Sequence, residues 1–368
     1  MKKTILFLLN KEVTYLPPFM AILDSLCSQY SLKVISYEKV GGVEALRKQY
    51  AGRDVTFLSK STQDTSQQLL SRVKRRAKRM LNVSSDFHKE AKAILDRESY
   101  DLLWIIHENT AIEFTDILGD KSYLLSIYEL HDTQPSFLKQ LEPVAQNALR
   151  VIAPEYNRAC ILKFWLQLDY IPSVIPNKPY AHPRKRDIDN MWFTNTSGKK
   201  VLLYQGYLNK NRSIDTICAA VEQMHDWMLL LLGKGEPDYV RHLTESFPNI
   251  VHVDFVEPPH HLDVTSWARV GIVKYDWYDL NHAYCAPNKT WEYAGFGIPM
   301  IGNELPGLRY TIGQYGAGIC TNLDSIDCIR AAIMQIDHNY EEFSKNATKY
   351  YNSFDIKKAL DDIVKGHI

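Results

Sequence analysis

The feature that most constrains the fold of this chain is a regular alternation of short apolar runs with longer stretches of helical periodicity. Runs such as Met228-Leu229-Leu230-Leu231-Leu232 are apolar at every position, a pattern typical of strands buried on both faces of a parallel sheet. The expected strands are residues 5–9, 32–36, 54–58, 102–106, 123–127, 150–153 and 173–175, followed by 201–205, 227–232, 250–253, 270–273, 298–302 and 317–320. Strand–helix alternation that occurs twice predicts an α/β protein with two doubly wound, Rossmann-like domains.

A change in composition marks the boundary between these domains. The first set of strands ends in Ile175-Pro176-Asn177-Lys178-Pro179, residues 180–199 are polar and irregular, and a new apolar run starts at Lys200-Val201. Such polar, proline-containing stretches between periodic segments are typical of linkers. A length of 368 residues also suits about two domains of roughly 150 residues each.

The composition argues against several classes of protein. Hydrophobic residues make up 45% of the chain, which argues against a disordered one. Lysine plus arginine and aspartate plus glutamate both number 43, so the net charge is zero and nucleic-acid binding is not expected. The six cysteines form no C-x-x-C pair, which favours free thiols in a reducing compartment.

The N-terminal apolar run, residues 5–9, is followed at once by Asn10-Lys11-Glu12. It is shorter than the roughly 7–15 apolar residues of a signal peptide, so it is interpreted as the first buried strand. No run reaches the ~18 apolar residues of a membrane span. We therefore expect a cytoplasmic protein.

One segment departs from the neutral background. Six of the eight residues from 72 to 79 are basic, namely Arg72, Lys74, Arg75, Arg76, Lys78 and Arg79. On a helix, the apolar residues around them form a stripe beside a basic face, and each basic residue near an anionic membrane contributes about 1 kcal/mol. This predicts peripheral contact with the inner face of the cell membrane. The alternative is a solvated surface helix packed on its own domain.

Glycines and basic residues follow two strands of the second half. Gly206 follows residues 201–205, and Arg212 stands where the next helix begins, a combination that suits a phosphate. Gly233-Lys234-Gly235 follows residues 227–232 but does not complete G-x-G-x-x-G, because the sixth position is Asp238. No G-x-x-x-x-G-K-[ST] loop is present either, which argues against NAD enzymes and P-loop NTPases.

The segment 281–301 has the most chemically informative pattern. Pro287-Asn288 predicts a helix start with Asn288 as the cap. Free N–H groups there, together with Lys289, suit a diphosphate. Glu292 lies three residues further on the same helical face, where a carboxylate can accept hydrogen bonds from both hydroxyls of a ribose. The alternative is an ordinary helix start with a lysine–glutamate surface pair.

The second half of the chain resembles the C-terminal domain of GT-B glycosyltransferases. The resemblance is carried by residues 206–212, by residues 233–235 and above all by residues 287–299, Pro-Asn-Lys-Thr-Trp-Glu-Tyr-Ala-Gly-Phe-Gly-Ile-Pro. The most similar group is that of the family 4-like bacterial sugar transferases. The first half of the chain resembles the N-terminal half of that group. The matching segments are Tyr128-Glu129-Leu130-His131-Asp132, Val151-Ile152-Ala153-Pro154-Glu155-Tyr156 and residues 175–179. The resemblance spans most of the chain in the same order.

The resemblance implies roles for individual residues. Glu292 matches the second glutamate of the family's E-x7-E element, which holds the donor ribose, whereas Tyr284 stands where the first glutamate is expected. Arg212 matches a residue that contacts the donor diphosphate, with Lys289 beside it, and His131 matches a histidine near the transferred sugar. Tyr207 replaces the basic residue often found after the strand-end glycine. The first of these departures, Tyr284, leaves the donor-sugar contacts and the choice between retention and inversion of configuration open.

The resemblance also implies an architecture. We expect an N-terminal, acceptor-side domain over 1–178, a nucleotide-sugar domain over 199–349, a cleft between them, and a C-terminal helix near 350–368 that packs back on the first domain. Relatives stabilise the leaving diphosphate with basic groups and helix ends, and this chain has no D-x-D triplet, so no metal and no cofactor besides the donor substrate are expected.

Ionisable residues follow two strands of the first half. Glu108 follows residues 102–106, and His131 and Asp132 follow residues 123–127. An inverting transfer needs a general base on the acceptor hydroxyl, and any of the three suits that role. A retaining transfer relies more on positioning and on charge stabilisation.

The predicted function is transfer of a sugar from a nucleotide diphosphate, with UDP as the first nucleotide to test, to a hydroxyl of a glycan or lipid-linked acceptor. The expected context is the synthesis of bacterial surface polysaccharides or glycoconjugates. Two alternatives remain: a nucleotide-sugar 2-epimerase of GT-B shape, and a catalytically degenerate partner subunit of a polysaccharide-assembly complex.

Overall fold

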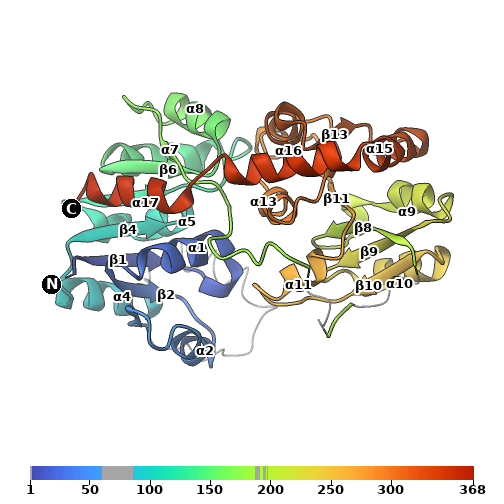
Figure 1. Cartoon of the computed structure of the whole chain (residues 1–368). Helices are drawn as coiled ribbons and strands as arrows, with labels where there is room; N and C mark the ends of the chain where they lie inside the picture. The colour runs from blue at the N-terminus through green and yellow to red at the C-terminus, as the bar shows by residue number, and fades with distance from the viewer. Residues whose placement is uncertain (1, 60–85, 187–190, 194–195, 197) are drawn as a thin grey trace. The chain divides into compact units, whose positions relative to one another are not determined.

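The computed structural model describes residues 2–59, 86–186, 191–193, 196 and 198–368. The basic segment 72–79 therefore lies outside the described residues. The chain divides into two compact units (Figure 1): unit 1 comprises Met1–Pro176 and Ile356–Ile368, and unit 2 comprises Asn177–Asp355. For comparison, the expected bounds were 1–178 and 199–349. The segment that looked like a linker, residues 180–199, falls within unit 2.

The sheet of unit 1 has seven parallel strands in the order β3-β2-β1-β4-β5-β6-β7. The interior strand β1 is fully buried from Ile5 to Leu9, and its Phe7 pairs with Val34 of β2 and Trp104 of β4. The strands are β1 (Thr4–Leu9), β2 (Ser31–Ser36), β3 (Val55–Phe57), β4 (Leu102–Ile106), β5 (Tyr123–Ser126), β6 (Arg150–Ala153) and β7 (Ser173–Val174).

The described helices of unit 1 connect these strands and cover the sheet. They are η1 (Val13–Tyr15), α1 (Pro17–Leu26), α2 (Gly42–Gln49), α4 (Asp86–Arg97), α5 (Glu108–Glu113), α6 (Thr115–Leu118), α7 (Pro135–Gln146), α8 (Tyr156–Trp165) and α17 (Ile356–Lys365). α17, red in Figure 1, packs on α1. It buries Leu360 and Val364, and its Asp361 accepts a hydrogen bond from the Tyr30 hydroxyl at 3.1 Å.

The sheet of unit 2 has six parallel strands in the order β10-β9-β8-β11-β12-β13. Alternate residues of its central strand feed two separate cores, since Leu202 faces one apolar cluster and Leu203 the other. This is the two-sided burial that the continuous apolar runs predict. The strands are β8 (Lys200–Gln205), β9 (Trp227–Leu232), β10 (Ile250–Val253), β11 (Val270–Val273), β12 (Met300–Asn303) and β13 (Gly318–Thr321).

The helices of unit 2 flank this sheet (Figure 1). They are η2 (Lys210–Arg212), α9 (Asp215–Glu222), α10 (Pro237–Ser246), α11 (His261–Thr265), α12 (Leu280–Ala283), α13 (Asn288–Gly295), α14 (Pro306–Leu308), η3 (Arg309–Gly313), α15 (Ile326–His338) and α16 (Tyr340–Asn352). α16 ends before Ser353-Phe354-Asp355, and the chain then passes to α17. The C-terminal helical stretch is therefore two helices, one in each unit.

All thirteen expected strands are present, and most of their ends agree to within a residue. The strand expected at 298–302 begins later, at Met300, because the residues before it close the end of α13. Gly297 adopts φ 69° there, and the N–H groups of Gly297 and Ile298 donate to the carbonyls of Ala294 and Tyr293 at 3.0 Å. This pair of bonds is a Schellman motif, which satisfies the last carbonyls of a helix.

Both sheets reverse their strand order once, between β1 and β4 in unit 1 and between β8 and β11 in unit 2. In open parallel sheets, ligands bind outside the carboxyl ends of the strands at such reversals. The fold therefore directs attention to the residues that follow these four strands. Among the residues that the structure describes, no helix is long and apolar enough to span a membrane, and all six cysteines are free thiols.

Candidate functional site

At the order reversal of unit 2, two glycines let the backbone turns after β8 and β9 approach closely. Gly206 and Gly233 have φ angles of 148° and 135°, values that side chains disfavour. The Gly206 N–H donates to Leu232 O at 2.9 Å, and a Cβ on Gly233 would lie 2.4 Å from Gly206 O. Glycine is therefore required at Gly233 by space as well as by φ.

Lys289, in the first turn of α13, reaches the end of β8. Its Nζ donates to Gln205 O at 2.7 Å and lies 3.4 Å from the place that a Cβ on Gly206 would occupy. Burial lowers the pKa of Lys289 to about 8, opposed by the charge of Glu292 and reinforced by that of Arg212. The ammonium therefore remains charged at pH 7, next to the glycine that follows β8.

Glu292 lies one turn further along α13 and is only 6% exposed. Its Oε2 accepts a hydrogen bond from Gln205 Nε2, and its Oε1 lies 3.2 Å from His261 Nε2. Burial acts to raise the pKa of Glu292, but His261, Lys289 and the Gln205 amide outweigh burial and lower it. The carboxylate is thus ionised, and Glu292 is not the surface partner of Lys289 that the simpler interpretation expected.

The other residues predicted for this site occupy varied positions. Arg212 is exposed at the end of η2, with Nη2 3.4 Å from His282 Nε2. Asn288 is the first residue of α13 and not its cap: Pro287 takes the cap position, without a side-chain cap bond. The prediction of an Asn288 cap was therefore wrong, because the extended backbone of Pro287 (ψ 137°) precedes the helix. Tyr284 follows α12 and is partly buried.

Sequence reasoning missed His261 as a part of this site. The structure places His261 at the start of α11, with its Nε2 against the Glu292 carboxylate. A histidine in a proline-containing loop carries no sequence signal of a carboxylate partner 31 positions away. No cluster of three or more metal-ligating side chains occurs within the described ranges.

Unit 1 has a second polar cluster at the carboxyl ends of β4 and β5. Glu108, the first residue of α5, is fully buried. Its Oε1 pairs with His131 Nε2 at 2.8 Å and lies 3.4 Å from His107 Nδ1, while its Oε2 accepts the Tyr128 N–H at 2.9 Å. Burial acts to raise the pKa of Glu108, but His107 and the hydrogen bonds from His131 and Tyr128 lower it.

The two histidines of this cluster have an unusual backbone. His107 and His131 have φ angles of 79° and 56°, and each such conformation of a non-glycine residue costs of order 1–3 kcal/mol. Lys11, which follows β1, places its Nζ 2.6 Å from His107 Nε2. Burial lowers the pKa of His107, and the charge of Lys11 adds to that effect. Strain of this kind concentrates at functional sites, and this cluster lies at the order reversal of unit 1.

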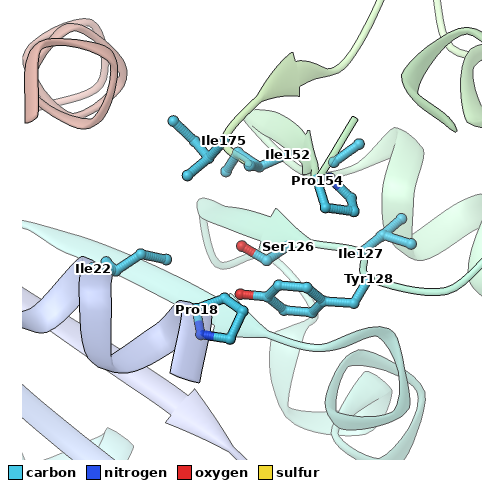
Figure 2. Close-up of a pocket in the computed structure, with 9 residues that line it drawn as sticks. Pro18, Ile22, Ser126, Ile127, Tyr128, Ile152, Pro154 and Ile175 are labelled. Carbon is cyan, nitrogen blue, oxygen red and sulfur yellow. The ribbon is translucent and has the colours of Figure 1, made fainter. Parts of the chain in front are cut away.

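A small cavity lies near the carboxyl ends of the strands of unit 1, next to the cluster around Glu108 (Figure 2). It offers about 10 Å³ to the centre of a water molecule, roughly the space that one water needs. Its walls come from α1, from the last residues of β5 and β6, and from the residues that follow β5, β6 and β7; the Tyr128 ring lies beside Pro18 in the close-up. Asp132 is partly buried and follows His131 directly.

No protein-family model and no curated protein matches this sequence. Solved structures match it along nearly the whole chain. A sucrose-phosphate synthase from Thermosynechococcus elongatus superposes with a TM-score of 0.69 at 14% identity, covering 99% of this chain and 98% of that chain. Anabaena HepE, in complex with UDP and glucose, has a TM-score of 0.67 at 13% identity, covering 99% of each chain.

A glycosyltransferase from Rickettsia africae also superposes with a TM-score of 0.67 at 13% identity, covering 100% of this chain and 98% of that chain. Similarity at this level of identity concerns the fold. The chain therefore has the GT-B fold of these proteins, with two Rossmann-like α/β units, as the motif order predicted.

Proposed function

We propose that this chain is a glycosyltransferase that moves a sugar from a nucleotide diphosphate donor to an acceptor hydroxyl. The observation that carries the proposal is the placement of Lys289 and Glu292 one turn apart on α13, with the Lys289 ammonium beside Gly206 at the end of β8. A cation and a buried, ionised carboxylate at the order reversal of a Rossmann-like sheet suit the diphosphate and the ribose of one ligand.

Each sequence-predicted site residue of unit 2 has an assigned role in this proposal. Arg212, Lys289 and the uncapped N–H groups that begin with Asn288 bind the diphosphate. Glu292 accepts hydrogen bonds from the ribose hydroxyls. Gly206 and Gly233 allow the turns after β8 and β9 to approach closely, and Tyr284 is assigned to contact with the donor sugar. UDP is the first nucleotide to test, because Anabaena HepE was solved with UDP and with UDP-glucose.

In unit 1, we assign contact with the acceptor to His131. Its Nε2 is bound to Glu108, which leaves Nδ1 for the proton of the acceptor hydroxyl. The hydroxyl oxygen then attacks the anomeric carbon, and the bond from that carbon to the donor phosphate breaks with its electron pair leaving on the diphosphate. Glu108 is fully buried, so its role is to position His131, and Asp132 is the second base to test.

The acceptor and the location in the cell are inferred from the resemblance and from the basic segment. We propose a glycan or lipid-linked acceptor in bacterial surface polysaccharide synthesis, with transfer that needs no metal ion. The basic residues between Arg72 and Arg79 provide the charge for peripheral contact with the inner face of the membrane. Co-sedimentation with anionic vesicles, compared with neutral vesicles, tests that contact directly.

Proton NMR of UDP-glucose incubated with the protein tests the activity. We expect slow release of UDP and glucose without an acceptor, at least about tenfold slower for His131→Ala, whereas a matched surface variant, Lys139→Ala on α7, keeps the wild-type rate. The configuration of the first glucose anomer formed distinguishes inversion from retention. Appearance of a 2-epimer of the donor in place of hydrolysis would support the epimerase alternative and contradict the transferase.

A further inference from the structure

The carboxylate of Glu292 is held from two directions by one short helix. His261 and Thr265 are four residues apart on α11, so both lie on the same face of that helix. His261 Nε2 contacts Glu292 Oε1 directly at 3.2 Å. Thr265 acts through Gln205, whose Oε1 lies 3.0 Å from the Thr265 hydroxyl. Both oxygens of the carboxylate therefore depend on α11.

The Gln205 amide lies between Thr265 and Glu292, and these two side chains fix its orientation. An ionised Glu292 accepts hydrogen bonds only, so the Gln205 amide must direct its N–H group to Oε2. Its carbonyl then faces the buried hydroxyl of Thr265, which has Gln205 Oε1 at 3.0 Å and His261 O at 2.9 Å as acceptors. Gln205 is also the last residue of β8, and its carbonyl accepts from Lys289. The same contacts thus order the end of β8 at the proposed donor site.

The surroundings of His261 indicate that its contact with Glu292 is the reason for its burial. Its Nδ1 atom is buried and has no hydrogen-bond partner within the described part of the chain. Burying a polar nitrogen without a partner lowers stability, so an apolar residue would serve better if only packing were needed. We therefore attribute the presence of an imidazole at this position to the contact of its Nε2 with the Glu292 carboxylate.

We propose that His261 and Thr265 are positioning residues of the donor site, which hold the Glu292 carboxylate in the orientation that accepts the ribose hydroxyls of a nucleoside diphosphate. The inference rests on the proposed function and extends it to α11, for which that function assigned no role. It predicts that donor affinity depends on side chains that do not themselves contact the donor.

The inference also predicts a dependence of donor affinity on pH. Burial opposes the charge of His261, but the Glu292 carboxylate and Asp263 outweigh burial and raise its pKa. Lys289 faces the same carboxylate, and His182 Nε2 contacts the Glu292 carbonyl at 2.9 Å. As the pH rises through the pKa of His261, the carboxylate loses its cationic partner and repels the diphosphate more strongly. UDP affinity should then fall.

Titration calorimetry with UDP tests the inference on the full chain. We expect the dissociation constant to rise about tenfold for His261→Ala and severalfold for Thr265→Val. The change His261→Gln, which keeps an N–H donor but never a charge, should restore part of the affinity. The matched control is His260→Ala, since His260 is an exposed neighbour on the same turn and should bind UDP as the wild type does. Thermal unfolding without ligand shows whether each variant is folded.

The ratio of dissociation constants between His261→Gln and the wild type is the decisive quantity. It should be largest near pH 6 and decline toward one as His261 loses its proton, because the titration of Lys289 affects both proteins alike. A ratio that does not change between pH 5.5 and 8.5, or equal affinities for His261→Ala and the wild type, would overturn the inference.

Failure of the proposed function would look different. If the wild type binds neither UDP nor guanosine diphosphate, the donor site itself is wrong, and this inference fails with it. If the wild type binds UDP and Arg212→Ala weakens binding while the α11 variants do not, the donor site holds and only the role of α11 is refuted.

Discussion

At the scale of single residues, both units keep a buried carboxylate ionised at the order reversal of their sheet. Glu108 is surrounded by His107, His131 and a backbone N–H, and Glu292 by His261, Lys289 and the Gln205 amide. A buried carboxylate without such partners would be protonated, because desolvation favours the neutral form. The same partners that keep the charge also fix the geometry, which suits a site that must bind or orient a polar ligand.

The ionisation of Glu108 can be tested through stability. Its pKa is lowered in the folded state, so its contribution is present above the unfolded pKa, near 4.5, and is lost as the pH falls below that value. We expect Glu108→Gln to reduce the free energy of unfolding by about 3–5 kcal/mol at pH 7, because breaking a buried pair leaves its partners uncompensated. The loss should be smaller at pH 4. Urea unfolding at both pH values measures it, and an equal loss at the two would contradict the assignment.

At the scale of elements, the strand ends of unit 2 depend on close backbone approach. Gly233 combines φ 135° with a carbonyl where its Cβ would lie. We expect Gly233→Ala to destabilise the protein by more than the ~1–3 kcal/mol that backbone strain alone costs, and to weaken UDP binding. Gly52→Ala is the matched control, since Gly52 has φ 78° but open space around it. Chemical denaturation of both variants separates the backbone strain from the steric contact with the Gly206 carbonyl. Equal losses in the free energy of unfolding would mean that only the φ angle matters.

The positions of the strands and helices are the part of the structure that the sequence predicts best. Continuous apolar runs located the strands that are buried along their whole length, such as Trp227–Leu232, because a strand buried on both faces has no polar alternation. Side-chain partners far apart in sequence were not visible: nothing in the local pattern connects His261 with Glu292. The left-handed backbone of His131 was equally hidden, since its strain is compensated by the contacts of the folded chain.

At the scale of the whole molecule, the chain forms two units, and the first is completed by its own C-terminus. α17 returns to unit 1 and buries Leu360 against it. We expect Leu360→Ala to lower the free energy of unfolding by about 2–4 kcal/mol, the usual result of a cavity in a core. UDP affinity should not change, because the proposed donor residues lie in unit 2. Urea unfolding and titration calorimetry check the two parts, and a parallel loss of UDP binding would contradict this separation.

The central claim is that unit 2 binds a nucleoside diphosphate through Lys289. The most direct measurement is titration calorimetry of the wild type with UDP at pH 7, beside Lys289→Ala and the exposed control Lys345→Ala on α16. We predict binding by the wild type and the control, at least about tenfold weaker binding by Lys289→Ala, and weaker wild-type binding at pH 9, because the pKa of Lys289 is about 8. Equal affinities of Lys289→Ala and the wild type, or no binding at all, would contradict the account.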